Sequence, residues 1–135
     1  MDTANNAKVK DSGKRQEFST GSRRDTQDGK PRYDLISPIM LTRLGIHLAK
    51  GAVKYGDRNW EKGQPLMRYV DSALRHLYKW QARLGDEDHL TAAIWNLQAA
   101  LHTEDQIMRE ILPEELDDRP RYGVGTEDFE YWTGK

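Results

Sequence analysis

The chain has 135 residues, of which 36% are hydrophobic and 32% charged, and its formal net charge is −1. This length suits a single domain with flexible ends, and the near-neutral charge argues against a general nucleic-acid binder. Cysteine is absent, so disulfides and thiolate chemistry are excluded and a metal ion would have carboxylate, imidazole, amide or water ligands. No run approaches the roughly 20 apolar residues of a membrane span, and no signal-peptide core follows Met1. We therefore expect a cytoplasmic protein without a membrane partner.

The first 34 residues are polar and contain two kinds of segment. Residues 1–22 are rich in Lys, Asn, Ser and Gly, which predicts a disordered tail. In the following segment, Asp28-Gly29 favours a turn and Pro31 favours an extended Lys30. Lys30 and Arg32 could bind phosphate from such an arm, Arg32 through its bidentate guanidinium. A solvated basic loop is the alternative.

Apolar spacing predicts three main helices. The first begins at Ser37-Pro38 and ends near Gly56, because Ser caps helices, Pro is tolerated at the first helical position and Gly ends them. The second should cover 66–84 and the third should follow the acidic turn at 85–88 and continue to about 111. Their apolar stripes are Leu66, Val70, Ala73, Leu77, Trp80 and Leu84, and Leu90, Ile94, Leu97, Leu101, Met108 and Ile111. We expect an all-α bundle whose thin core is completed by oligomerisation.

The third helix has two further faces of interest. His89 and Asn96 share an edge with Ala93 and Ala100, whose small side chains favour close helix packing and would leave His89 and Asn96 lining the seam. Trp95 and His102 point the other way. We interpret their face as a subunit interface or as the surface covered by the aromatic C-terminal tail.

Polar and aromatic groups concentrate in two clusters, at 57–61 and 86–89. Asp57, Asn59 and Glu61 offer oxygen ligands or hydrogen bonds, and Trp60 offers a flat face for a base. The alternative is that Trp60 closes the end of the bundle while Asn59 caps a turn. Carboxylate and amide oxygens suit Mg²⁺ or Mn²⁺ and fit zinc poorly. Together with the cations of the chain, these clusters are typical of a nucleotide phosphate site.

Other reaction types lack the residues that they need. No nucleophile elbow, P-loop, GxGxxG or HExxH is present.

His76 borders the stripe of the second helix and can face a cleft between helices, whereas His47 suits packing or the surface. The pair Asp71 and Arg75 has an ordinary explanation as an ion pair one turn apart.

Several runs of the chain resemble one enzyme family. These runs are Arg24-Asp25, Gly29 to Leu35, Lys54 to Gly63, Ser72 to Leu77, Asp86 to Leu90 and Ala92 to Asn96. They are similar to phage and prophage dATP/dGTP diphosphohydrolases, which belong to the MazG-like all-α nucleoside triphosphate pyrophosphatases. The similarity covers about residues 23–120 and is carried most specifically by the Tyr-Gly-Asp-Arg-Asn-Trp run and the Asp-His-Leu run.

The resemblance implies a MazG-like helical bundle that hydrolyses a purine deoxynucleoside triphosphate between the α and β phosphates. The products are the monophosphate and pyrophosphate. It also implies two or more Mg²⁺ or Mn²⁺ ions per site, with Co²⁺ as another option, and a homo-oligomer, dimer or tetramer. In some phages such enzymes supply dGMP for making 2-aminoadenine nucleotides.

The chain departs from the ExxE and ExxD helix pair through which the wider superfamily binds metal, so the site has to be assigned by position. We expect a catalytic domain over 23–112 and a tail over 113–135 that docks on the body or on a neighbouring subunit. The predicted catalytic residues are Glu87, Asp88, His76 and His89. The predicted metal ligands are Glu61, Asp71, Glu87, Asp88 and Asn96. The predicted nucleotide-binding residues are Lys30, Arg32, Tyr55, Asp57, Asn59, Trp60 and Arg75.

Two other functions remain open from the residues alone. The same helical scaffold could bind or sequester a nucleotide without hydrolysing it. Alternatively, Arg23, Arg24, Lys30 and Arg32 could bind DNA phosphates as part of a phage structural module.

Overall fold

The computed structural model describes residues 11–123. The chain divides into two compact units, Met1–Ile36 and Ser37–Lys135, each of which is described by itself. The elements in chain order are β1 (Arg15–Glu17), β2 (Arg23–Asp25), η2 (Tyr33–Leu35), α1 (Pro38–Tyr55), η3 (Asn59–Lys62), α2 (Leu66–Gln81), α3 (His89–Met108) and η4 (Glu114–Leu116), where η marks a short 3₁₀ helix. No helix among the described residues is long and apolar enough to cross a membrane.

The first unit contains a small antiparallel hairpin. Strand β1 pairs with β2, with Arg15 opposite Asp25. The connecting turn uses Gly21 in the left-handed region, at φ +85°, and Phe18 N–H donates to the Ser22 carbonyl at 2.9 Å. The structure thus differs from the disordered tail expected over 1–22, because local turn geometry and strand pairing organise residues 15–25.

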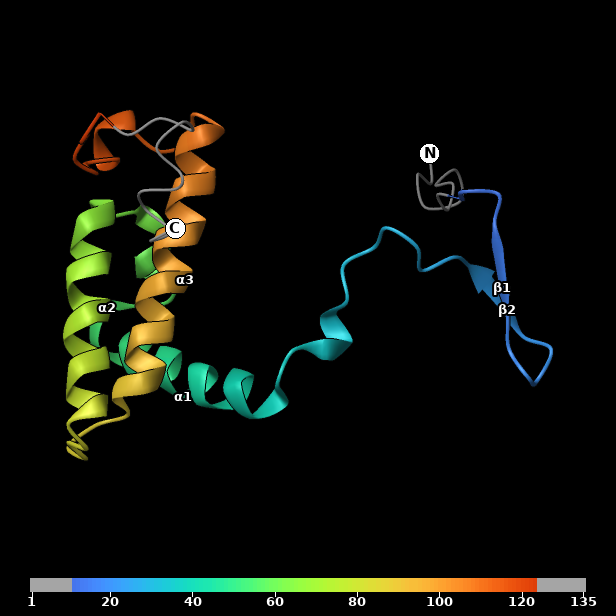
Figure 1. The fold of residues 1–135 in the computed structure, drawn as a ribbon, viewed down its shortest axis with the longest axis horizontal. Helices are drawn as coiled ribbons and strands as arrows, with labels where there is room; N and C mark the ends of the chain where they lie inside the picture. The colour runs from blue at the N-terminus through green and yellow to red at the C-terminus, as the bar shows by residue number, and fades with distance from the viewer. Residues whose placement is uncertain (1–10, 124–135) are drawn as a thin grey trace. The chain divides into compact units, whose positions relative to one another are not determined.

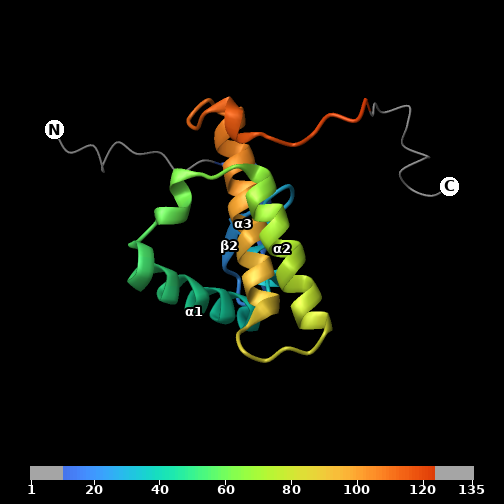
Figure 2. The same cartoon turned by 90° about the vertical axis from the view of Figure 1, so that its left-hand side faces the viewer.

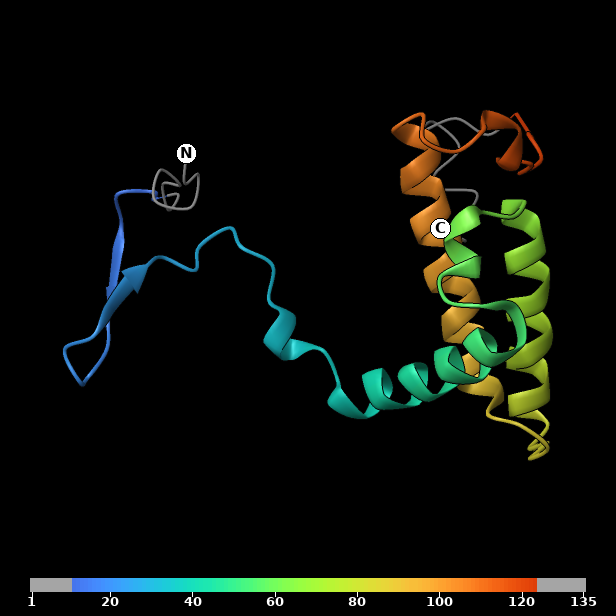
Figure 3. The same ribbon diagram turned by 180° about the vertical axis from the view of Figure 1, so that it is seen from behind.

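The second unit contains the three α-helices and confirms the all-α fold class. Helices α2 and α3 lie side by side and antiparallel, and α1 crosses near the end of this pair at which the α2–α3 connection lies (Figure 1). In the side view, α1 begins near the end of α3 at which the α2–α3 connection lies, and η3 lies nearer the opposite end of α3 (Figure 2). From behind, η3 lies against α3, in agreement with the contacts between them (Figure 3). Residues of α1, η3 and α3 line a common cavity.

The helix ends follow local chemistry. Ser37 Oγ accepts a hydrogen bond from Met40 N–H at 3.1 Å, and Gly56 ends α1 at φ +89°, as the sequence predicts. Helix α2 ends at Gln81, three residues before the predicted end, because Arg83 adopts a left-handed φ of +62°. The second and third helices are thus separated by a longer connection than the sequence suggests.

Small residues dominate the contact between α2 and α3. Ala73 of α2 and Ala92, Ala93 and Ala99 of α3 are all buried, so the two helices can approach closely. Of the edge predicted to hold His89, Asn96, Ala93 and Ala100, the first three residues are buried and Ala100 is half-buried. The apolar stripe of α3 behaves differently: Leu97, Leu101 and Met108 are exposed by 51%, 71% and 77%. Leu77, Trp80 and Leu84 of the second predicted stripe are also exposed, and Tyr69 is buried instead.

The segment after α3 packs on the start of α2. Gly63 adopts φ +86°, and a Cβ at this position would lie 2.8 Å from Leu112 Cδ1 and 3.0 Å from Leu116 Cδ1. Asp118 Oδ1 accepts a hydrogen bond from Met67 N–H at 2.9 Å, near the start of α2. Residues 112–118 therefore contact the helical body. The aromatic tail residues Phe129, Tyr131 and Trp132 lie outside the described residues.

Candidate active site

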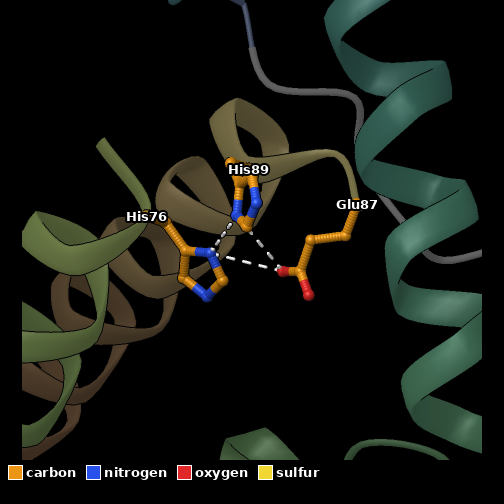
Figure 4. A group of neighbouring side chains, drawn as sticks. All are labelled: His76, Glu87 and His89. Carbon is orange, nitrogen blue, oxygen red and sulfur yellow. Dashed lines mark hydrogen bonds and ion pairs between the residues drawn. The ribbon is translucent and has the colours of Figure 1, made fainter. Parts of the chain in front are cut away.

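Three side chains converge where α2 meets the start of α3. His76 lies in the last two turns of α2, His89 is the first residue of α3, and Glu87 lies in the connection between them. The two Nδ1 atoms are 3.0 Å apart, and Glu87 Oε1 lies 3.3 Å from His76 Nδ1 and 3.6 Å from His89 Nδ1. Figure 4 shows all three groups pointing toward one another. We call His76, Glu87 and His89 the metal-capable cluster, because these atoms could hold an ion together.

The metal-capable cluster is closed on one side and open on the other. The His89 side chain is only 1% exposed, whereas that of Glu87 is 52% exposed. Burial lowers the pKa of His76, and the nearby Glu87 carboxylate opposes this shift. His76 is therefore favoured as a neutral imidazole, the form that can bind a metal ion.

Asp88, a predicted metal ligand, has a structural partner on each side. Its Oδ1 accepts a hydrogen bond from Thr91 N–H at 3.2 Å and so caps α3. Arg43 of α1 binds the same carboxylate with both Nε and Nη2, at 2.9 and 2.5 Å. The Arg43 guanidinium, helped by Thr91, holds the pKa of the Asp88 carboxyl well below its usual value. Asp88 therefore ties α1 to α3, and its role as a metal ligand stays a prediction.

Replacement of Asp88 should separate these roles. Asp88→Ala should lower the free energy of unfolding by about 1 kcal/mol, the typical cost of losing a helix cap. Asp88→Asn keeps a capping oxygen, and should lose only about 0–1 kcal/mol from the solvent-exposed ion pair with Arg43. Because the folded-state pKa is depressed, the carboxylate stabilises the fold above its unfolded pKa of about 3.9, and this contribution is lost as pH falls further.

Urea denaturation at neutral and acidic pH checks these values. The difference between the parent and Asp88→Ala should shrink below the unfolded pKa, and an undiminished difference would contradict the cap and ion-pair account. Full turnover in Asp88→Ala would exclude Asp88 as a metal ligand.

A cavity of about 820 Å³ lies between α1, η3 and α3. Trp60 of η3 and Trp95 of α3 provide its large flat faces, and Asn59 and Gln64 provide amides. The other lining residues are Gly45, His47, Leu48, Ala49, Gly51, Ala52, Tyr55, Gly56, Asp57, Arg58 and Glu61. A volume of this size falls within the usual range for small-molecule sites. We call this space the aromatic cavity.

The aromatic side chains of the cavity are held by their neighbours. Trp95 lies 5.6 Å from His47 and 6.3 Å from Tyr69, measured between ring centroids. Trp60 contacts His102 edge to face, at 4.9 Å. The expectation that Trp95 and His102 lie on a subunit interface or under the C-terminal tail stays a prediction, because both side chains are only partly buried and the tail lies outside the described residues. Helix α1 and η3 of the same chain cover this face, because the chain turns back at Gly56 to bring η3 onto α3.

His47 lines the aromatic cavity on the side from which the Glu87 and Asp88 charges act on it. Burial lowers its pKa, and the two carboxylates oppose this shift. The sequence favours packing or the surface for His47 and indicates no role for Gln64. No signal in the local pattern indicates that either residue shares a cavity with Trp95.

The remaining predicted metal ligands lie apart from the metal-capable cluster. Asn96 is buried two turns further along α3, and its Nδ2 donates to the Ala92 carbonyl at 2.8 Å. Asp71 forms an exposed ion pair with Arg75 on α2. Glu61 lines the aromatic cavity and pairs with Arg58 at 2.6 Å. Their roles as ligands stay predictions, and the structure gives each a local partner.

The seven predicted nucleotide-binding residues fall into two groups and one single residue, Arg75, which pairs with Asp71 on α2 and does not line the aromatic cavity. Four of them line the aromatic cavity: Tyr55, Asp57, Asn59 and Trp60. Lys30 and Arg32 belong to the unit Met1–Ile36, where Lys30 pairs with Asp25 and Arg32 with Asp34. Their role in phosphate binding stays a prediction.

Comparison with known families adds a decisive observation. A family model described as "dATP/dGTP diphosphohydrolase, N-terminal" matches residues 20–118, which is most of the chain. The chain belongs to this family. Searches of curated proteins and of solved structures returned no match. The match to the dATP/dGTP diphosphohydrolase family includes both the metal-capable cluster and every residue that lines the aromatic cavity.

Proposed function

We propose that the protein is a metal-dependent hydrolase that cleaves dGTP or dATP between the α and β phosphates. The products are the deoxynucleoside monophosphate and pyrophosphate. The observation that carries this proposal is the presence of a cluster able to hold a metal ion near an aromatic cavity, within the residues that match the family. A bound divalent ion would offset phosphate charge and polarise the attacking water.

The aromatic cavity offers contacts of the kind that a purine base needs. The Trp60 and Trp95 rings can stack on the base, and such stacking contributes about 1–3 kcal/mol per base in nucleic-acid sites. The side-chain amides of Asn59 and Gln64 can each donate and accept hydrogen bonds along a base edge. Arg58 also lines the cavity, where it pairs with Glu61, and its guanidinium could bind a phosphate if that ion pair opened.

His47 supports a single site rather than two separate ones. It lines the cavity and is close enough to Glu87 and Asp88 to experience their charges. A nucleotide with its base in the aromatic cavity can therefore direct its phosphates past His47 toward the metal-capable cluster. With dGTP as substrate, the product dGMP would be available for phage 2-aminoadenine nucleotide synthesis.

Product analysis tests the proposed reaction. The protein is incubated with each dNTP and Mn²⁺, and the products are separated by ion-exchange chromatography. We expect the monophosphate and pyrophosphate to appear in equal amounts, with dGTP and dATP turned over faster than dCTP and dTTP. Release of orthophosphate would contradict cleavage between the α and β phosphates. Tight binding without turnover would instead support a nucleotide-sequestering protein.

We also propose that the protein forms a homo-oligomer, a dimer or a tetramer. Leu97, Leu101 and Met108 recur at spacings of four and seven, which places them on one face of α3, and all three are exposed. The buried residues of α2 and α3 include four alanines, which bury little apolar area per residue. A second copy packed on this face would bury the leucines that the single chain leaves in water.

A further inference from the structure

The composition of the metal-capable cluster distinguishes between the ions expected for this enzyme, which are Mg²⁺ or Mn²⁺ with Co²⁺ as another option. Two of its three converging atoms are imidazole nitrogens, and only Glu87 contributes oxygen. Mg²⁺ prefers oxygen ligands and retains several water molecules, whereas imidazole suits Mn²⁺, Co²⁺, Fe²⁺ and Zn²⁺ better. Among the expected ions, Mg²⁺ or Mn²⁺ with Co²⁺ as another option, the ligand chemistry of the three residues thus favours Mn²⁺ and Co²⁺ over Mg²⁺.

The distances between the three atoms match those between ligands of one ion. Two ligand atoms each about 2.1 Å from a metal lie about 3.0 Å apart at an angle of 90° and about 3.4 Å apart at the tetrahedral angle. The observed separations are 3.0 Å between the two Nδ1 atoms and 3.3 and 3.6 Å from these atoms to Glu87 Oε1 (Figure 4). The three atoms can therefore occupy one face of a coordination sphere with small adjustments of Glu87.

Asp86 fixes the chemical form of His89. Its Oδ1 lies 2.7 Å from His89 Nε2, and a carboxylate can only accept a hydrogen bond, so Nε2 carries the hydrogen. The Nδ1 lone pair of His89 is then free to point at His76 and Glu87. A carboxylate behind a metal-binding histidine is a common arrangement, because it orients the ring and raises its basicity. Among the described residues, this contact distinguishes the cluster from a chance meeting of polar groups.

The cluster also has an open side. His89 is enclosed, and half of the Glu87 side chain faces solvent. Three protein ligands with the remaining positions open are typical of catalytic metal sites, in which water or substrate completes the coordination. Two histidines and one carboxylate on one face form a known type of site for divalent transition ions.

We propose that His76, Glu87 and His89 form a site that binds one divalent transition ion in preference to Mg²⁺. This proposal names the ion for the hydrolysis proposed above and rests on that function for its role. The binding preference itself follows from the ligand atoms and does not require turnover. The same 3.0 Å distance between the two Nδ1 atoms also permits a hydrogen bond from His76 to His89, and this is the competing explanation.

Metal binding by the full chain tests the proposal directly. Metal-stripped protein is titrated with Mn²⁺, and the free ion is followed by electron paramagnetic resonance with and without a large excess of Mg²⁺. We expect a tight Mn²⁺ site with one ion per chain that Mg²⁺ does not displace. His76→Ala and Glu87→Gln should each weaken this binding by at least about 10-fold, the lower limit for losing a group that merely supports a ligand.

The matched control is His102→Ala, which removes another half-buried histidine outside the cluster. It should leave Mn²⁺ affinity unchanged, and circular dichroism should show that all variants are folded. Displacement of Mn²⁺ by an equal concentration of Mg²⁺ would overturn the proposal, as would His76→Ala and Glu87→Gln binding as tightly as the parent. If His76 and His89 only form a hydrogen bond with each other, the titration should find no tight Mn²⁺ site.

The two proposals fail in different ways. Full hydrolysis with Mg²⁺ and no preference for Mn²⁺ would overturn the metal assignment and leave the proposed function intact. Tight Mn²⁺ binding that depends on His76 and Glu87, without any dNTP hydrolysis, would support the metal assignment and contradict the function.

Discussion

Glu87→Gln is expected to reduce dGTP hydrolysis by at least about 100-fold, the upper end of the loss seen for groups that only support a metal ligand. The substitution keeps the size of the side chain and removes the charge that faces both histidines. Because half of the Glu87 side chain is exposed, the free energy of unfolding should change by less than about 0.5 kcal/mol. Steady-state kinetics at saturating Mn²⁺ and chemical denaturation measure the two effects separately.

Glu115→Gln is the matched control for this prediction. Glu115 is an exposed glutamate of η4, on the segment that follows α3. The control should retain parental turnover and stability. Equal activity of Glu87→Gln and Glu115→Gln would show that the charge at the cluster has no part in the reaction.

Leu101→Glu is expected to shift the protein from an oligomer to a monomer. Leu101 lies in the middle of the exposed apolar face of α3 and is 71% exposed in the single chain. Burying an unpaired carboxylate in an interface costs several kcal/mol, so association should weaken by about 100-fold or more. Light scattering coupled to size-exclusion chromatography over a range of concentrations measures the change.

The control for this second variant is Leu35→Glu. Leu35 is also 71% exposed but belongs to the unit Met1–Ile36. It should leave the mass in solution unchanged. If the parent protein is a monomer at every concentration, or if Leu101→Glu associates as the parent does, the α3 face is not a subunit interface.

Local signals predicted the helices well. Ser37-Pro38 and Gly56 set the ends of α1 because capping and left-handed glycine act within a few residues. The match of residues 20–118 confirms the family suggested by the sequence runs. The end of α2 was less predictable, since the left-handed conformation of Arg83 is uncommon for a residue of its type.

Which face of each helix is buried depends on contacts between distant segments, and local sequence patterns do not encode these contacts. Both apolar stripes and the small-residue edge of α3 were visible in the sequence, but the structure buries the alanines and leaves Leu97 and Leu101 exposed. Trp95 is covered because the chain turns back at Gly56 and brings η3 onto α3. This contact joins segments that are distant in the sequence, so no local pattern indicates it. The pair Arg43 and Asp88 joins residues 45 positions apart, so no spacing rule predicts it.

The roles of the predicted site residues stay predictions, but the structure shows which of these residues lie together. His76, Glu87 and His89 were all candidates, and the structure brings them together, because a helix hairpin places the end of α2 beside the start of α3. Asp71 and Asn96 were chosen by residue type and position, and they lie on other parts of the helices with partners of their own. Residue type identifies which groups can bind metal, whereas the hairpin geometry decides which of them meet.

Hydrolysis of dGTP in water enriched in oxygen-18 tests the central claim most directly. If water attacks the α-phosphorus, mass spectrometry will find the heavy oxygen in dGMP and none in pyrophosphate. Label in pyrophosphate would show attack at the β-phosphorus, and label in orthophosphate would show removal of the terminal phosphate; either result would contradict the account.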